Sequence, residues 1–183
     1  MALMHTPAPS FGAPCPDFSL PATDGKILSA KDLRNGRPFL VMFICNHCPY
    51  VKAVEDRLIA LGHEARERGM NVVAISSNDA EHYPADSFPN MKKLAEEKNY
   101  SFPYLYDESQ RVAKDFGAVC TPDFFLYDSR GLLAYRGRLD DSWKDPAGVT
   151  KRELWTAMET LLAGRPLDSE QIPSMGCSMK WRT

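Results

Sequence analysis

The sequence predicts a single α/β domain with a mixed central sheet flanked by helices, and three observations carry this prediction. The continuous apolar run 39–44 is typical of a parallel strand buried on both faces, 71–76 is expected to be the next buried strand, and a helical pattern separates them. Two further apolar runs, 124–127 and 132–135, flank a turn-forming segment as in an antiparallel hairpin. The chain has 183 residues, a length suited to one domain with its own core.

The remaining elements follow in order along the chain. Residues 1–16 form a proline-rich, extended and loosely held lead-in, and 17–26 form an N-terminal β-hairpin extension. A short extended segment is expected over 104–106. Helices are expected where apolar residues recur at helical spacing, namely after Pro49 up to Arg68 and over 89–99, 108–116 and 151–162. The chain then divides into the lead-in (1–16), the domain (17–166) and a C-terminal tail (167–183).

Charge and hydropathy exclude several classes of partner. The net charge is -2, with 22 Lys plus Arg against 24 Asp plus Glu and no basic block, so neither nucleic acid nor an anionic membrane is an expected partner. No apolar run reaches the roughly 18 residues of a membrane span, and no basic segment followed by an apolar run opens the chain. The five cysteines are an odd number, which disfavours a disulfide framework. These observations predict a cytoplasmic protein.

The chemistry is expected at Cys45-Asn46-His47-Cys48-Pro49, where a buried strand meets a helix. The N-terminus of a helix carries partial positive charge, which favours a thiolate, the nucleophilic form of cysteine. His47, when protonated, adds a second positive charge within the turn. Pro49 fits the first helical position because it has no N–H to donate, and this places Cys48 at the N-cap. A Cys-x-x-Cys beside a βαβ pattern is typical of a dithiol redox centre that needs no cofactor and no metal.

Two other interpretations of this segment remain open. The cysteines would be ordinary core residues if the pairing were coincidental, since free cysteine commonly packs as a small apolar side chain. Alternatively, Cys45, His47, Cys48 and a distant cysteine would bind zinc or copper, although no second Cys-x-x-Cys or His-rich motif completes such a site.

Several motifs together resemble the thioredoxin-like superfamily, in the branch of the alkyl hydroperoxide reductase and thiol-specific antioxidant proteins, which is peroxiredoxin-like. The resemblance runs from about Gly12 through the last predicted helix. The motifs that carry it are Ala13-Pro14-x-Pro16-Asp17-Phe18-x-Leu20, Cys45-x-x-Cys48-Pro49, Thr121-Pro122 and Tyr135-Arg136-Gly137-Arg138. The resemblance implies a thioredoxin fold in which Pro122 is a cis proline and the loop of Thr121 and Pro122 borders the reactive cysteines.

Two registers follow from the resemblance. In the thioredoxin register Cys45 attacks and Cys48 resolves the mixed disulfide. In the peroxiredoxin register Cys48 is the peroxidatic cysteine, while Cys45 replaces a threonine and Cys120-Thr121-Pro122 replaces the region of a peroxide-orienting arginine. Arg136 or Arg138 would have to supply that arginine. The sequence therefore predicts a thiol–disulfide oxidoreductase, with an antioxidant thiol peroxidase as the alternative and a non-catalytic binding or metal-binding protein as a third.

Three further residues bear on the redox chemistry. His47 occupies the second position between the cysteines, as in strong disulfide oxidants of the DsbA type, so we expect a potential above the roughly -270 mV of thioredoxin. Cys120, two residues before Pro122, is either a third redox partner or a core residue. Cys177 lies on a glycine-bearing tail that can fold back to resolve a disulfide or simply pack. The expected partners are thiols and disulfides of proteins or small molecules, with peroxides in the alternative function.

Overall fold

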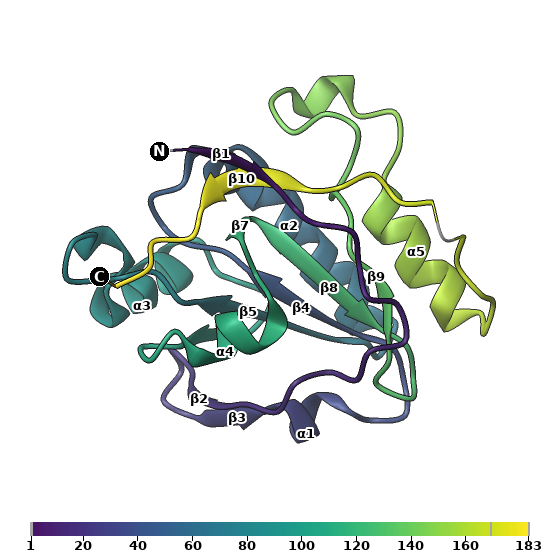
Figure 1. The fold of residues 1–183 in the computed structure, drawn as a ribbon, viewed down its shortest axis with the longest axis horizontal. Helices are drawn as coiled ribbons and strands as arrows, with labels where there is room; N and C mark the ends of the chain where they lie inside the picture. The colour runs from purple at the N-terminus through teal and green to yellow at the C-terminus, as the bar shows by residue number, and fades with distance from the viewer. Residues whose placement is uncertain (1, 169, 183) are drawn as a thin grey trace.

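The central sheet is mixed, as the sequence predicts. The computed structural model describes residues 2–168 and 170–182 (Figure 1). Within them, β4 pairs parallel with β5 and antiparallel with β8, while β6 and β9 form the two edges. In spatial order the strands are β6 (Tyr104–Tyr106), β5 (Asn71–Ser76), β4 (Phe39–Phe43), β8 (Asp123–Tyr127) and β9 (Leu133–Tyr135).

Strand alternation divides the core between the two faces of this sheet. Successive side chains of a strand point to opposite faces, so Leu40 and Met42 pack with α2 and α5, whereas Val41 and Phe43 pack with α4 and the N-terminal hairpin. Both faces are therefore covered, which explains the continuous apolar run in β4. The helices are α2 (Pro49–Glu67), α3 (Phe88–Glu97), α4 (Arg111–Phe116) and α5 (Glu153–Leu162).

The N-terminal hairpin is confirmed, and one helix is shorter than predicted. The hairpin consists of β2 (Ser19–Pro21) and β3 (Ile27–Ser29), followed by the short α1 (Ala30–Leu33). The helix expected from residue 108 begins at Arg111, because Gln110 has a left-handed backbone with φ of 60°. Asp107 lies just before this break and accepts a hydrogen bond from the Ala113 amide at 3.0 Å.

A three-stranded sheet joins both ends of the chain, and the sequence did not predict it. Its order is β1-β10-β7, formed by β1 (Leu3–His5), β10 (Met175–Ser178) and β7 (Cys120–Thr121). In Figure 1, β1 and β10 cross together above the start of α2. The expectation of a loosely held lead-in is thus wrong: β1 pairs with β10, and the Thr6 amide donates to the Ser174 carbonyl at 2.9 Å.

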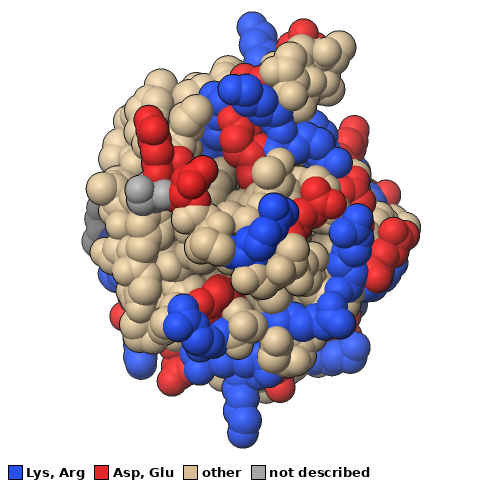
Figure 2. Space-filling view, turned by 90° about the vertical axis from the view of Figure 1, so that its right-hand side faces the viewer, with Lys and Arg blue, Asp and Glu red and all other residues tan. Residues whose placement is uncertain are grey.

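The surface agrees with the near-neutral composition. On the face shown in Figure 2, basic and acidic side chains are interspersed rather than gathered into one patch of either sign. Of the helices in the described residues, none combines the length and the apolar character that crossing a membrane requires.

Candidate active site

Cys48 lies at the N-cap of α2, as the position of Pro49 predicts. Its backbone is extended, with φ of -68° and ψ of 122°, and Pro49 is the first residue of the helix. The N–H groups in the first turn of a helix have no partner within the helix, so their partial positive charge lies next to Cys48. The side chain of Cys48 is fully buried. The positive end of α2 therefore acts on this sulfur from close range.

Cys45 lies in the connection between β4 and α2, and Thr121 links it to Cys48. The Cys45 sulfur is 3.4 Å from the Thr121 hydroxyl, and the Cys48 sulfur is 3.1 Å from the Thr121 carbonyl oxygen. The Thr121–Pro122 peptide bond is cis, as the family resemblance implies. The loop that resembles the thioredoxin cis-proline loop thus borders both cysteines.

The two thiols differ sharply in acidity. The pKa of Cys48 is lowered to about 4, first because the Cys45 thiol donates a hydrogen bond to its sulfur. Cys177, the Thr121 hydroxyl and the Val51 amide add further hydrogen bonds, and together these outweigh the opposing effect of burial. The pKa of Cys45 is well above its ordinary value because of the hydrogen bond to Cys48, burial and the nearby Asp86 carboxylate. Cys48 is thus the sulfur that ionises first.

A buried carboxylate, Asp86, holds the segment between the cysteines. Its Oδ1 accepts hydrogen bonds from the backbone amides of Asn46 at 2.8 Å and His47 at 3.2 Å. Its Oδ2 lies 2.6 Å from the His47 Nδ1 and accepts from the Asn78 amide at 2.8 Å. The His47 ring also stacks on the Tyr83 ring, with the two ring centroids 5.1 Å apart. His47 is therefore held by Asp86, so any positive charge on the ring is paired with that carboxylate.

Sequence reasoning missed Asp86 because no local pattern marks it. It lies in a short 3-10 helix (Pro84–Asp86) far along the chain from the cysteines, and only the fold brings it to them.

Cys45, His47 and Asp86 do offer three ligand atoms within 4.8 Å of one another. However, both oxygens of Asp86 already take part in hydrogen bonds, and a metal ion would have to displace them.

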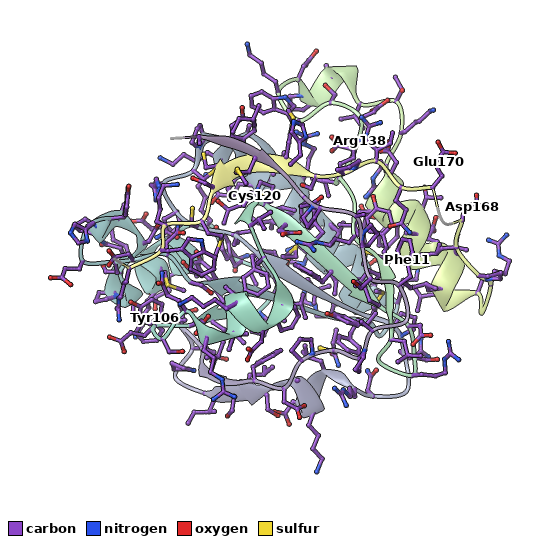
Figure 3. All side chains as sticks on the ribbon, viewed as in Figure 1. Phe11, Tyr106, Cys120, Arg138, Asp168 and Glu170 are labelled. Atoms are coloured by element: carbon purple, nitrogen blue, oxygen red, sulfur yellow. The ribbon has the colours of Figure 1, made fainter. Side chains whose placement is uncertain are left out.

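Neither arginine considered for peroxide binding faces the cysteines. Arg136 is buried and forms two hydrogen bonds to Asp123, at 2.9 and 3.2 Å, and a third to the Gly117 carbonyl at 2.8 Å. Arg138 pairs with Glu153 at the start of α5. In Figure 3, Arg138 lies on the α5 side of the molecule, away from Cys120. Both guanidinium groups are thus engaged elsewhere.

The other cysteines fall into two groups, and all five are free thiols. Cys120, labelled in Figure 3, lies in β7 opposite Ser178 of β10. It is buried with its sulfur 3.6 Å from the Pro122 carbonyl oxygen, and burial raises its pKa strongly. Burial also raises the pKa of Cys15, to about 11. Cys177 differs, because it is paired opposite Thr121, whose carbonyl oxygen is 3.1 Å from the Cys48 sulfur. The tail therefore does fold back and brings Cys177 to the pair.

A pocket of about 370 Å³ opens beside the cysteines without reaching them. Pro122, Tyr50, Trp143 and Met175 are among its lining residues, and none of the cysteines is. Cys45, Cys48 and Cys177 are all buried. A substrate therefore reaches the sulfurs only if a covering segment moves, and β10, which carries Met175, is the strand that lies over them.

Comparison with known proteins gives a family and a class of relatives. The model of the AhpC/TSA family matches residues 11–136. The thiol:disulfide interchange protein DsbE of Tatumella citrea is 30% identical over 142 residues, which covers 73% of this chain and 70% of that protein. An uncharacterized conserved protein from Geobacillus kaustophilus superposes with a TM-score of 0.93 at 46% identity, covering 100% of this chain and 97% of that one. A thioredoxin-family thiol:disulfide interchange protein from Chlorobium tepidum, with a TM-score of 0.63 at 20% identity over 85% of this chain and 99% of its own, shares the fold.

These relatives confirm three predictions and contradict one. The thioredoxin fold, the superfamily branch and the enzyme class agree with what the sequence predicted. The predicted cytoplasmic location is wrong, because the DsbE relatives act in the periplasm. That prediction used the odd cysteine count and the lack of an apolar run near residue 1. Neither property separates compartments for a dithiol enzyme, since its reactive pair must cycle between thiol and disulfide wherever it works.

Proposed function

Since this chain belongs to the AhpC/TSA family, we propose that it is a thiol–disulfide oxidoreductase whose redox-active pair is Cys45 and Cys48. The observation that carries the proposal is the asymmetry of the pair: one sulfur at the N-cap of α2 with its pKa lowered to about 4, beside a second whose pKa is raised. A thiol that ionises at neutral pH next to one that stays protonated is the arrangement that disulfide exchange requires.

The reaction then runs in two steps. The Cys48 thiolate attacks a substrate disulfide, and the displaced substrate sulfur leaves as a thiolate that takes up a proton. Cys45 then loses its proton and attacks the Cys48 sulfur, which releases the second substrate thiol and forms the Cys45–Cys48 disulfide. The reverse sequence oxidises a substrate dithiol. This order, with Cys48 attacking first, follows the peroxiredoxin register rather than the thioredoxin register.

The substrates proposed are protein or small-molecule disulfides and dithiols, because the DsbE relatives are thiol:disulfide interchange proteins. The apolar pocket beside Pro122 and Tyr50 would receive a side chain next to the substrate disulfide. Thiol peroxidase activity is the second candidate, and the acidic Cys48 favours it. Against it stand Arg136 and Arg138, each engaged with a carboxylate away from the cysteines.

Equilibration with glutathione buffers tests the proposal. The purified protein would be brought to equilibrium at a series of potentials, its free thiols alkylated, and its mass measured by mass spectrometry. Cys120→Ser is the control, because it removes a buried thiol outside the pair. We expect a reversible two-electron transition between Cys45 and Cys48 above the roughly -270 mV of thioredoxin. A potential at or below about -300 mV, as in structural disulfides, would contradict the proposal.

A further inference from the structure

The strand β10 lies directly over the proposed redox pair. It pairs antiparallel with β7, so that Cys177 is opposite Thr121 and Ser178 opposite Cys120. The approach is tightest at Gly176, where a Cβ would come 2.0 Å from the Thr121 carbonyl oxygen. Only glycine allows the two backbones to lie this close. The pairing therefore brings the tail onto the same residue, Thr121, that both cysteines of the pair contact.

This placement puts a third sulfur, that of Cys177, beside the pair. Cys48 and Cys177 are buried in the same core cluster and both lie at Thr121: the Cys48 sulfur is 3.1 Å from the Thr121 carbonyl oxygen, and Cys177 is paired opposite Thr121. Cys45 and Cys177 thus both lie near Cys48, because all three residues are gathered around Thr121.

Hydrogen bonds fix the tail in this position. Beyond β10, the Met179 amide donates to the Val119 carbonyl at 3.0 Å. The Lys180 amide donates to the Asn78 side chain at 2.9 Å, and the Lys180 carbonyl accepts from the Asp79 amide at 2.8 Å and from the Gln110 side chain at 2.7 Å. These bonds are formed by buried polar groups, which would be costly to leave unpaired. These bonds lie beyond β10 and anchor the chain there, so Cys177 returns to the same place beside Cys48 whenever β10 lies on β7.

We propose that Cys177 is a third redox-active cysteine, which exchanges disulfides with Cys48 when β10 lies on β7. The proposal rests on the proposed function, because it requires Cys48 to form a mixed disulfide with a substrate. β10 covers Cys48, so the strand lifts to admit the substrate and brings Cys177 back to the sulfur that has reacted.

The exchange balances in thiols and electrons. Cys177 gives up its proton and its thiolate attacks the Cys48 sulfur of the mixed disulfide. The bond between Cys48 and the substrate sulfur breaks, the Cys48–Cys177 bond forms, and the substrate leaves as a thiolate that takes up a proton. The substrate disulfide has then gained two electrons and two protons from two cysteines of the enzyme. Cys45 can next attack Cys48, which gives the Cys45–Cys48 disulfide and returns Cys177 to a thiol.

Cys120 provides the contrast within the same strand pair. It is adjacent to Thr121 and equally buried, but alternation along β7 points its side chain away from that of Thr121, and its sulfur lies against the Pro122 carbonyl. A cysteine that is merely close to the site in sequence therefore lacks the contact that Cys177 makes.

The test uses the full chain with Cys45 replaced, so that Cys177 is the only partner left for Cys48. Cys45→Ser and Cys45→Ser/Cys177→Ser would be treated with oxidised glutathione, quenched with acid at intervals and digested with trypsin. Cys48 and Cys177 fall in separate tryptic peptides, ending at Lys52 and Lys180, so a disulfide between them gives a linked peptide. Cys45→Ser/Cys120→Ser is the matched control, because it removes a buried thiol from the neighbouring strand.

We expect Cys45→Ser and the control to form the Cys48–Cys177 disulfide, and to lose the Cys48–glutathione adduct about 100-fold faster than Cys45→Ser/Cys177→Ser. A Cys48–glutathione adduct that persists equally in all three variants would overturn the proposal. The single variant Cys177→Ser keeps this result apart from the proposed function, since it retains both Cys45 and Cys48. It is expected to form the Cys45–Cys48 disulfide, and its failure to do so would contradict the function proposed for the pair, whatever Cys177 does.

Discussion

The acidity of the pair predicts how the redox equilibrium responds to pH. With the pKa of Cys48 at about 4 and that of Cys45 well above 9.0, the reduced form carries one thiolate and one thiol throughout the range between these values. Reduction of the disulfide by two electrons therefore takes up one proton there, and two protons only below about pH 4. Each proton taken up lowers the potential of a two-electron couple by about 30 mV per pH unit.

The predicted slope from pH 5 to pH 8 is thus about -30 mV per unit, whereas two ordinary thiols give about -59 mV per unit. The assay is equilibration of the Cys45–Cys48 pair with dithiol–disulfide buffers at each pH, read by mass after alkylation. Cys120→Ser serves as the control, because its removal leaves the sulfurs and amides around Cys48 in place. A slope near -59 mV per unit across this range would mean that both sulfurs keep their protons, and it would refute the assignment of the Cys48 thiolate.

Three other outcomes follow from the geometry. Gly176→Ala sets a Cβ against the Thr121 carbonyl oxygen, so we expect β10 to separate from β7 and Cys48 to be alkylated at least about tenfold faster, while Ser178→Ala leaves the rate unchanged. Arg136→Met leaves the buried Asp123 carboxylate without its ion-pair partner, so we expect the free energy of unfolding in urea to fall by about 3–5 kcal/mol. An unchanged free energy of unfolding would mean that the ion pair is unimportant for stability. Hydrogen peroxide should oxidise reduced Cys48 with a rate constant below about 10⁷ M⁻¹s⁻¹ in stopped flow, and a faster reaction would make peroxidase the main function.

The sequence predicts the central sheet well because strands buried on both faces leave a strong local signal. The apolar run of β4 and the proline after Cys48 each reflect a local physical requirement, namely burial and the lack of an N–H. The third sheet leaves no such signal. The strand β1 is exposed and β7 has only two residues. In β10, Gly176 is needed only because its backbone lies against the Thr121 carbonyl. Pairing between the two ends of a chain is set by the tertiary fold and not by either segment alone.

The site shows the same division between local and long-range information. The N-cap position of Cys48 follows from Pro49 alone. The role of Asp86 does not, because an aspartate side chain is ordinarily solvated, and only the fold buries this one, in its short 3-10 helix, beside His47. From the sequence, a protonated His47 is expected to add a second positive charge near the cysteines, whereas the structure places its ring 2.6 Å from the Asp86 carboxylate. Its pairing with Asp86 shifts the stabilisation of the thiolate to the hydrogen bonds around Cys48.

The most direct test of the account is to measure which sulfur is ionised. Cys45→Ser retains Cys48, and Cys48→Ser retains Cys45, each with a hydroxyl in place of the removed thiol. The far-ultraviolet absorbance of the thiolate, followed from low to high pH, reports ionisation at equilibrium and does not require a reagent to reach buried sulfur. We predict that Cys45→Ser gains thiolate well below the ordinary cysteine pKa of about 8.5, while Cys48→Ser gains it only above that value. If instead Cys48→Ser shows the acidic thiol, Cys45 is the attacking residue and the thioredoxin order holds.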